Sequence, residues 1–304
     1  MVKRKRTDPE KGFFLFSKAA HHPLPERIFM FVEPEDYLEP RCPLGRPGHM
    51  RPAPRPEPAG RIPLPEIIAE CDDFFNSNDT AQLGEHLRFW RRRAQELGDE
   101  SGELSILSEL MGHYRMQRDE ERALAAVRDG LELMKLLDVY GTAGGGTILI
   151  NAATALQSFG HFSEALRYYA EAFRCYNVSL DPMDVRFAGL LNNMAAAYDA
   201  NGESAHAEAH YRKALNILQH HGNLMDSAVT YINLAQLYDR QDENDPRVTE
   251  MLDLAMACFD DPAAKRDGYY AHTCNKCASA FGLFGRESDE AELQQRAIKI
   301  YENA

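Results

Sequence analysis

A unit of two predicted helices recurs along this chain about every 42 residues. Two copies match best: Asn151–Leu156, Gly160, Ala165 and Ala172–Phe173 in the first, and Asn193–Tyr198, Gly202, Ala207 and Ala214–Leu215 in the second. Such a period indicates a row of similar helical hairpins, each packed on its neighbours, instead of one closed core. Such a row favours a function at an extended surface over one in a catalytic pocket.

Weaker copies keep the same register. They contain Met111–Tyr114, Asn233–Tyr238 and Lys276–Phe281, and a degenerate copy runs from Pro65 to about Leu97. In that degenerate copy Leu83, Leu87, Trp90 and Ala94 have helical spacing. The sequence thus predicts an all-α fold, an α-α superhelix (solenoid) of five to six hairpins over residues 65–304. An irregular, proline-rich arm is expected over residues 1–64.

The pattern resembles the tetratricopeptide repeat family over roughly residues 65–304. Small residues stand where paired helices would cross, and glycines stand in the turns. The matching positions are Ala153, Ala195, Ala235 and Ala278 at the crossings, Gly160, Gly202 and Gly285 in the turns, and Ala123, Ala165 and Ala207 at the start of the second helices. The stretch Leu191–Tyr198 is similar to the long repeats of kinesin light chains. Arg118 and Asn244–Pro246 depart from the turn glycine.

Charge separates the arm from the repeats. Residues 1–64 carry 12 Lys or Arg and 8 Asp or Glu, whereas residues 65–304 carry 22 and 39. The net charges are therefore +4 and −17, and an acidic body argues against binding nucleic acid through its phosphates. Twelve of the sixteen prolines lie in the arm. Its apolar runs Phe13–Phe16 and Arg27–Val32 leave three possibilities open: packing on the repeats, disorder, or docking to another protein.

Neither a membrane span nor a cofactor is expected. No apolar run approaches the length needed to cross a bilayer, and Phe13–Phe16 is too short for the core of a signal peptide. The chain is therefore expected to be cytoplasmic. Its six cysteines fit a reducing compartment, and no disulfide framework is suggested.

The candidate binding site lies on the first helix of each hairpin, which would line a concave groove. Asn151, Asn193 and Asn233 occupy one register in consecutive units. An asparagine amide offers both a donor and an acceptor, as an extended peptide backbone requires. The resemblance implies that these asparagines hold a bound peptide; alternatively, they bond neighbouring helices and stiffen the stack. The residues expected to tune the preference for a ligand are Asn192, Gln157, Gln236, Asp199, Asp239, Arg240 and Lys276.

Four other motifs have structural interpretations. Cys274 and Cys277 form a single Cys-x-x-Cys pair, whereas a zinc site needs about four ligands. His206 and His210 are four residues apart, but the glutamate does not directly follow the first histidine, as the zinc-protease motif requires. The glycine run Gly141–Thr147 lacks the lysine of a phosphate loop and is expected to be a connection or a bending helix start. Along Arg88–Arg93, ion pairing with the following Glu-rich helix is favoured over binding of an anionic partner.

The sequence therefore predicts a non-catalytic scaffold or adaptor that binds a protein or peptide segment in the groove of its repeats. Two alternatives remain. One is an intracellular receptor for a signalling peptide, although no DNA-binding helix-turn-helix precedes the repeats. The other is a self-assembling structural protein, which a missing polar cap at either end would favour. No metal site and no catalytic residues are expected.

Overall fold

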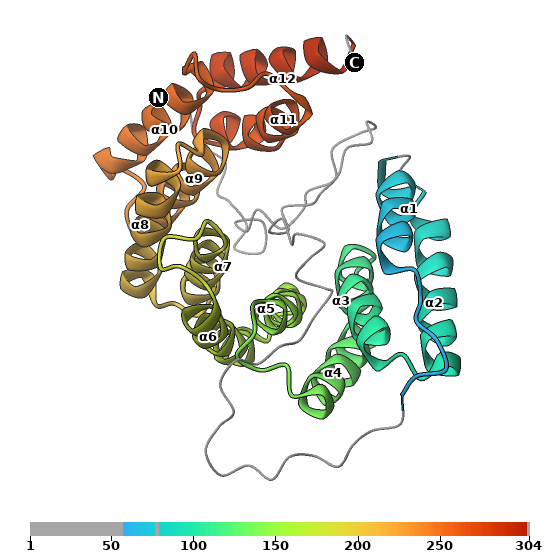
Figure 1. Ribbon diagram of the computed structural model, residues 1–304. Coiled ribbons are helices and arrows are strands. Elements are labelled where there is room, and N and C mark those ends of the chain that lie inside the picture. The colour runs from blue at the N-terminus through green and yellow to red at the C-terminus, as the bar shows by residue number, and fades with distance from the viewer. Residues whose placement is uncertain (1–56, 77–78, 303–304) are drawn as a thin grey trace. The chain divides into compact units, whose positions relative to one another are not determined.

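The computed structural model describes residues 57–76 and 79–302. Those residues form helices and no strand, as the all-α prediction requires (Figure 1). The helices are α1 (Leu64–Asn76), α2 (Thr80–Leu97), α3 (Glu100–Met116), α4 (Glu120–Leu137), α5 (Ala143–Ser158), α6 (Phe162–Ser179), α7 (Arg186–Ala200), α8 (Ser204–His220), α9 (Leu224–Gln241), α10 (Pro246–Asp260), α11 (Gly268–Leu283) and α12 (Glu287–Tyr301). Most of the expected arm, including both of its apolar runs, lies outside the described residues.

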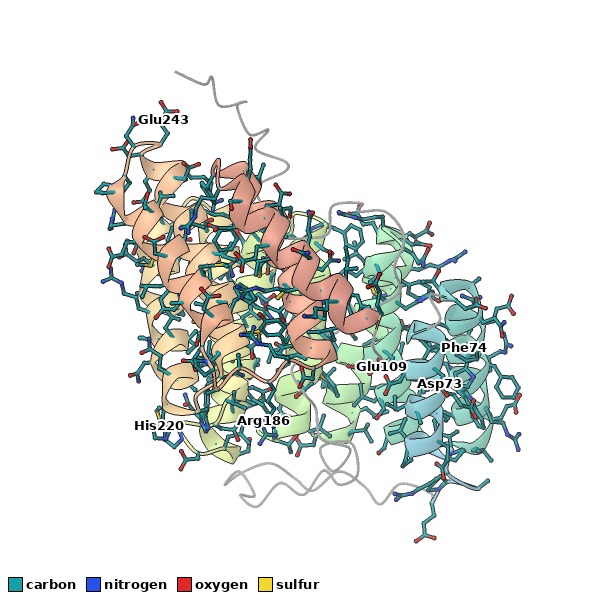
Figure 2. All side chains as sticks on the ribbon, turned by 90° about the horizontal axis from the view of Figure 1, so that it is seen from above. Asp73, Phe74, Glu109, Arg186, His220 and Glu243 are labelled. Atoms are coloured by element: carbon teal, nitrogen blue, oxygen red, sulfur yellow. The ribbon has the colours of Figure 1, made fainter. Side chains whose placement is uncertain are left out.

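The described chain divides into two compact units at residue 190, within α7. In the first unit α1 pairs with α2, α3 with α4 and α5 with α6, while α3 also packs on α5. In the second unit α9 pairs with α10 and α11 with α12, while α8 packs on α9. Figure 2 shows His220 and Glu243 at opposite ends of the second unit, because α8 and α9 run antiparallel.

The hairpins depend on small residues at the helix crossings. The crossing alanines Ala153, Ala195 and Ala235 are fully buried, and Ala278 is 1% exposed. An alanine lets two helix backbones approach closely, and a larger side chain of the next helix fills the space beside it. Tyr169 of α6 and Tyr211 of α8 are such side chains, at 0% and 3% exposure. The predicted role of these positions is confirmed.

The first hairpin is covered by a short irregular segment, residues 57–63. Its backbone is held at two points: the Ala59 amide donates to the Leu97 carbonyl (2.8 Å), and the Ile62 amide donates to Asp99 Oδ2 (2.9 Å). The other oxygen of the same carboxylate accepts from the Gly102 amide at the start of α3. Because Asp99 and Ile62 are both buried, this segment is part of the folded first unit.

Arg118 occupies the place of a turn glycine at a conformational cost. Its φ is +56°, in the region where Gly160 (+84°) and Gly202 (+80°) also lie. A residue with a Cβ pays about 1 kcal/mol to remain there, whereas glycine does not. We therefore expect Arg118→Gly to raise the free energy of unfolding by about 0.5–1 kcal/mol, as measured by urea denaturation. As a matched control, Arg128→Gly in the exposed face of α4 should lower it by about 1 kcal/mol; destabilisation by both variants would contradict the prediction.

Candidate functional site

Two of the three aligned asparagines lie on neighbouring helices of the second unit. Asn193 on α7 and Asn233 on α9 each stand two residues before a fully buried crossing alanine, Ala195 or Ala235. Both asparagines are partly exposed. Neither side chain makes a hydrogen bond within the parts of the chain that the structure describes. Their amides are therefore available to solvent or to a ligand.

Two side-chain links join α7 to α9, one on each side of Asn193 and Asn233 along the helices. Towards the start of the helices, Asn192 Nδ2 donates to Thr230 Oγ1 (2.9 Å), and the threonine hydroxyl faces the amide oxygen at 3.2 Å. Towards their ends, Arg240 forms an ion pair with Asp199. Asn193 and Asn233 lie between these two cross-links, so the separation of the two helices is fixed where the free amides are.

Between the cross-links, the residues that share a helix face with Asn193 and Asn233 are uncharged. Ala196 follows Asn193 by three residues and Gln236 follows Asn233 by three, so each pair shares one face of its helix. Gln236 is also partly exposed, and its amide has no hydrogen bond to any described residue. We call Asn193, Ala196, Asn233 and Gln236 the amide face. It consists of three neutral amide groups, each a donor and an acceptor, and one methyl side chain.

Two of the expected site residues lie in the first unit and are used internally. Asn151 Nδ2 on α5 donates to Ser108 Oγ on α3 at 2.8 Å. Gln157 is 6% exposed, and its Oε1 accepts from the Tyr169 hydroxyl at 2.8 Å. For Asn151, this is the helix-to-helix bond that the structural alternative expects. Gln157 faces the packed interior and not the surface that the helical register suggested.

The charged residues of the predicted site are spread along α7, α9 and α11. The Asp199 carboxylate is 5% exposed, and burial raises its pKa above the usual value, although Arg240 acts in the opposite direction. The ion pair makes this end of the amide face nearly neutral. Asp239 on α9 and Lys276 on α11 are partly exposed. Tyr269 at the start of α11 donates a hydrogen bond to Asp226 of α9, so these two helices are also linked.

The sequence analysis did not identify the hydroxyl partners of the asparagines. Thr230 is fully buried and Ser108 is 2% exposed. They lie 38 and 43 residues from Asn192 and Asn151, which is close to the length of one repeat. Asn193 has Thr154 and Tyr231 at similar separations, and Asn233 has Thr273, so sequence spacing does not identify which asparagines are bonded.

The remaining motifs have structural roles. Cys274 and Cys277 are buried, and burial raises the pKa of each thiol to about 12, which leaves little thiolate for metal binding or redox chemistry. No cluster of three or more His, Cys, Asp or Glu side chains in the described residues could hold a metal ion. Arg91 pairs with Glu103 and Asp129, which confirms the expected ion pairing for that arginine.

Comparison with known proteins supports the repeat assignment. A family model described as tetratricopeptide repeat matches residues 146–182 and 187–221, which correspond to the hairpins α5–α6 and α7–α8. These two hairpins therefore match tetratricopeptide repeats, as the sequence pattern predicted. Repeats of this class generally form non-catalytic scaffolds for protein interaction, with extended surfaces built from successive hairpins. No curated protein matches the chain significantly.

Several solved structures resemble it at low identity. A putative kinesin light chain with nearly identical repeats from Podospora anserina gives a TM-score of 0.47 at 16% identity, covering 65% of this chain and 94% of that one. BtubC from P. vanneervenii gives 0.48 at 18% identity, covering 80% and 92%. Scores below 0.5 carry no argument for function, so the assignment rests on the family model and on the hairpins themselves.

None of the helices in residues 57–76 and 79–302 is both long enough and apolar enough to cross a bilayer.

Proposed function

We propose that this chain is a non-catalytic scaffold or adaptor whose amide face binds an extended segment of a protein partner. The observation that carries the proposal is the pair Asn193 and Asn233, whose amides make no hydrogen bond to the described residues while their neighbours are bonded. Asparagine is a poor helix former, so its repetition at one helix position has a local cost. Binding of a ligand's backbone would offset that cost.

The chemistry of the face fits a peptide backbone better than a charged ligand. Each step of an extended chain presents one N–H donor and one C=O acceptor, and an asparagine or glutamine amide can satisfy both. Ala196 leaves room for the backbone to approach, because its side chain is a single methyl group. The Asp199–Arg240 pair at one end is internally neutralised, so it attracts neither an acidic nor a basic segment strongly. Lys276 and Asp239 would then tune the preference for neighbouring side chains.

Asn151 and Gln157 are not included in this proposed surface, because both are bonded within the first unit. The proposed binding surface therefore consists only of residues of the second unit. The repeat domain is proposed to span residues 65–304 and the N-terminal arm residues 1–64. The described segment 57–63 already packs on the first hairpin.

The proposal is tested by removing the free amides without disturbing the stack. In Asn193→Ala/Asn233→Ala, the loss of about two to four backbone hydrogen bonds should weaken partner binding roughly tenfold or more. The melting temperature should stay nearly unchanged, since neither amide bonds another described residue. Partners would be captured from source cells, identified by mass spectrometry, and the bound segment titrated by calorimetry.

Two matched variants make the result specific. Asn216→Ala removes an exposed asparagine from α8, away from the amide face, and should bind as the wild type does. Asn192→Ala breaks the bond to Thr230 and should lower the melting temperature. Equal affinity of the double variant and the wild type for the captured segment would refute the amide face as the binding surface. A large loss of stability in the double variant would show that these asparagines stiffen the stack.

A further inference from the structure

The two unbonded asparagines of the amide face, Asn193 and Asn233, occupy the same position of successive repeats. The side-chain links on either side of them follow the same order along α7 and α9, so these two helices are parallel. One link joins the short side chains of Asn192 and Thr230, whose polar atoms are 2.9 Å apart. Helices in such close contact have interaxial distances of about 8–10 Å. The two unbonded amides are therefore separated by about one interaxial distance.

Few backbone conformations repeat over that distance. In a β-strand, the backbone groups on one edge recur at every second residue, or about every 6.7 Å. In an α-helix the backbone groups bond one another, and the pitch is about 5.4 Å. A polyproline II helix has three residues per turn and a rise of about 3.1 Å, so equivalent groups recur about every 9 Å. Its backbone makes no internal hydrogen bonds, so its N–H and C=O groups remain available to asparagine amides.

The charge of the surface fits such a segment as well. The residues of the amide face are uncharged, and the Asp199–Arg240 pair beside them is neutral as a whole. A segment that contacts the amide face through its backbone therefore needs no charged side chain there. Proline and alanine, which favour or accept the polyproline II conformation, are compatible with this surface.

An aromatic ring lies near the N-terminal end of the same face of α9. Asp226, Val229 and Asn233 are spaced three and four residues apart, so they share that face. Val229 is partly exposed. Tyr269 of α11 donates a hydrogen bond to Asp226 and is itself 40% exposed. Exposed aromatic rings are what proline-rich segments commonly contact when they bind as polyproline II helices.

We infer that the amide face binds its partner segment as a polyproline II helix with an N–H at every third residue. Residues three apart in the segment place their backbone groups against Asn193 and Asn233. Proline fits the two positions between them, and its rings contact Val229 and Tyr269. The inference rests on the function proposed above, and it adds the conformation and the composition of the partner segment.

Nuclear magnetic resonance titration of the full chain with two blocked peptides tests the three-residue period. One peptide has four repeats of Ala-Pro-Pro and the other has six repeats of Ala-Pro, so both are uncharged and equally long. Only the first has an N–H on one face at every third residue; in the second, such groups recur on one face about every 19 Å. The Ala-Pro-Pro peptide should shift the side-chain amide signals of Asn193 and Asn233. It should bind about fivefold or more tightly than the Ala-Pro peptide.

A third peptide and four variants make the result specific. Four repeats of Ala-Gly-Gly keep every N–H but lose the preformed helix, so this peptide should bind about fivefold or more weakly than Ala-Pro-Pro. Asn193→Ala/Asn233→Ala should weaken binding of the Ala-Pro-Pro peptide about tenfold or more, whereas Asn216→Ala on α8 should not. Tyr269→Ala should also weaken it, while Tyr269→Phe, which keeps the ring, should not.

Two results would overturn the inference: no binding of the Ala-Pro-Pro peptide, or equal binding of the Ala-Pro-Pro and Ala-Gly-Gly peptides. The partner segment captured from cells separates this failure from a failure of the proposed function. If Asn193→Ala/Asn233→Ala weakens binding of the captured segment but the Ala-Pro-Pro peptide does not bind, the amide face binds a segment of another conformation. If neither ligand depends on the two asparagines, both the inference and the proposed function fail.

Discussion

Replacing Gly145 with alanine is expected to lower the free energy of unfolding by about 3 kcal/mol. A Cβ at this position would lie 2.2 Å from the Val139 carbonyl oxygen. That oxygen cannot move freely, because it accepts from the Thr142 hydroxyl at 2.7 Å. The same hydroxyl caps α5 by accepting from the Gly145 amide at 2.9 Å. The substitution therefore creates a clash with the backbone and also disrupts the helix cap.

Urea denaturation followed by circular dichroism measures this effect. Gly268→Ala is the matched control, since Gly268 also lies in the first turn of a helix and a Cβ there would meet nothing within 4 Å. It should be neutral or slightly stabilising, because alanine is the better helix former. Comparable unfolding free energies for the two variants would show that the turn before α5 can relax around the added methyl group.

The glycine run shows why some features of this chain are predictable from sequence and others are not. A helix start at these glycines was one of the two expectations, and α5 indeed begins at Ala143. The sequence does not show why glycine is needed, because the reason is contact with residues distant in the chain. At Gly146, a Cβ would lie 2.6 Å from the ring of Tyr176, thirty residues away. That tyrosine is fully buried, and its hydroxyl lies 3.0 Å from that of Thr147.

The repeat itself was predictable because each hairpin is specified locally. The crossing alanines, turn glycines and helical periodicity all lie within one unit, and the twelve helices of the described chain follow that register. Even the departures behave consistently: Arg118 adopts the positive φ of a turn glycine, and Asp245 caps α10 with Pro246 in its first turn. Side-chain partners on neighbouring hairpins could not be predicted in this way, since nothing within one repeat specifies them.

The candidate site illustrates that limit. Asn151, Asn193 and Asn233 are equivalent in the sequence register, but among the described residues only Asn151 of the three donates to a hydroxyl, that of Ser108 on α3. Asn192 likewise reaches Thr230, whereas Asn193, the next residue, projects from a different side of α7 and has no such partner among the described residues. One helical residue changes the direction of a side chain by about 100°, so bonded and unbonded amides can adjoin. The position in the repeat therefore predicts which asparagines are candidates for binding. It does not predict which of them bond a neighbouring helix and which remain unbonded.

Acid is expected to destabilise the second unit through His272. Burial and the nearby Lys276 lower the pKa of this histidine from its usual value to about 4, and its Nε2 is buried without a hydrogen bond in the described structure. Between pH 6.5 and pH 4 the unfolded chain therefore binds a proton that the folded chain does not. The free energy of unfolding should fall by about 3 kcal/mol over that range from this residue alone, and the contribution is fully present above pH 6.5.

The variant His272→Leu isolates this contribution from the carboxylates that also titrate in acid. Its stability at pH 7.5 should equal or slightly exceed that of the wild type, because an unpaired buried nitrogen is removed. Its loss of stability between pH 6.5 and pH 4 should be smaller than that of the wild type by about 3 kcal/mol. Urea titrations of both proteins at half-unit pH steps would measure the difference. Parallel pH profiles would mean that His272 is protonated in the folded chain, and that α11 accommodates a charge beside Lys276 instead of excluding it.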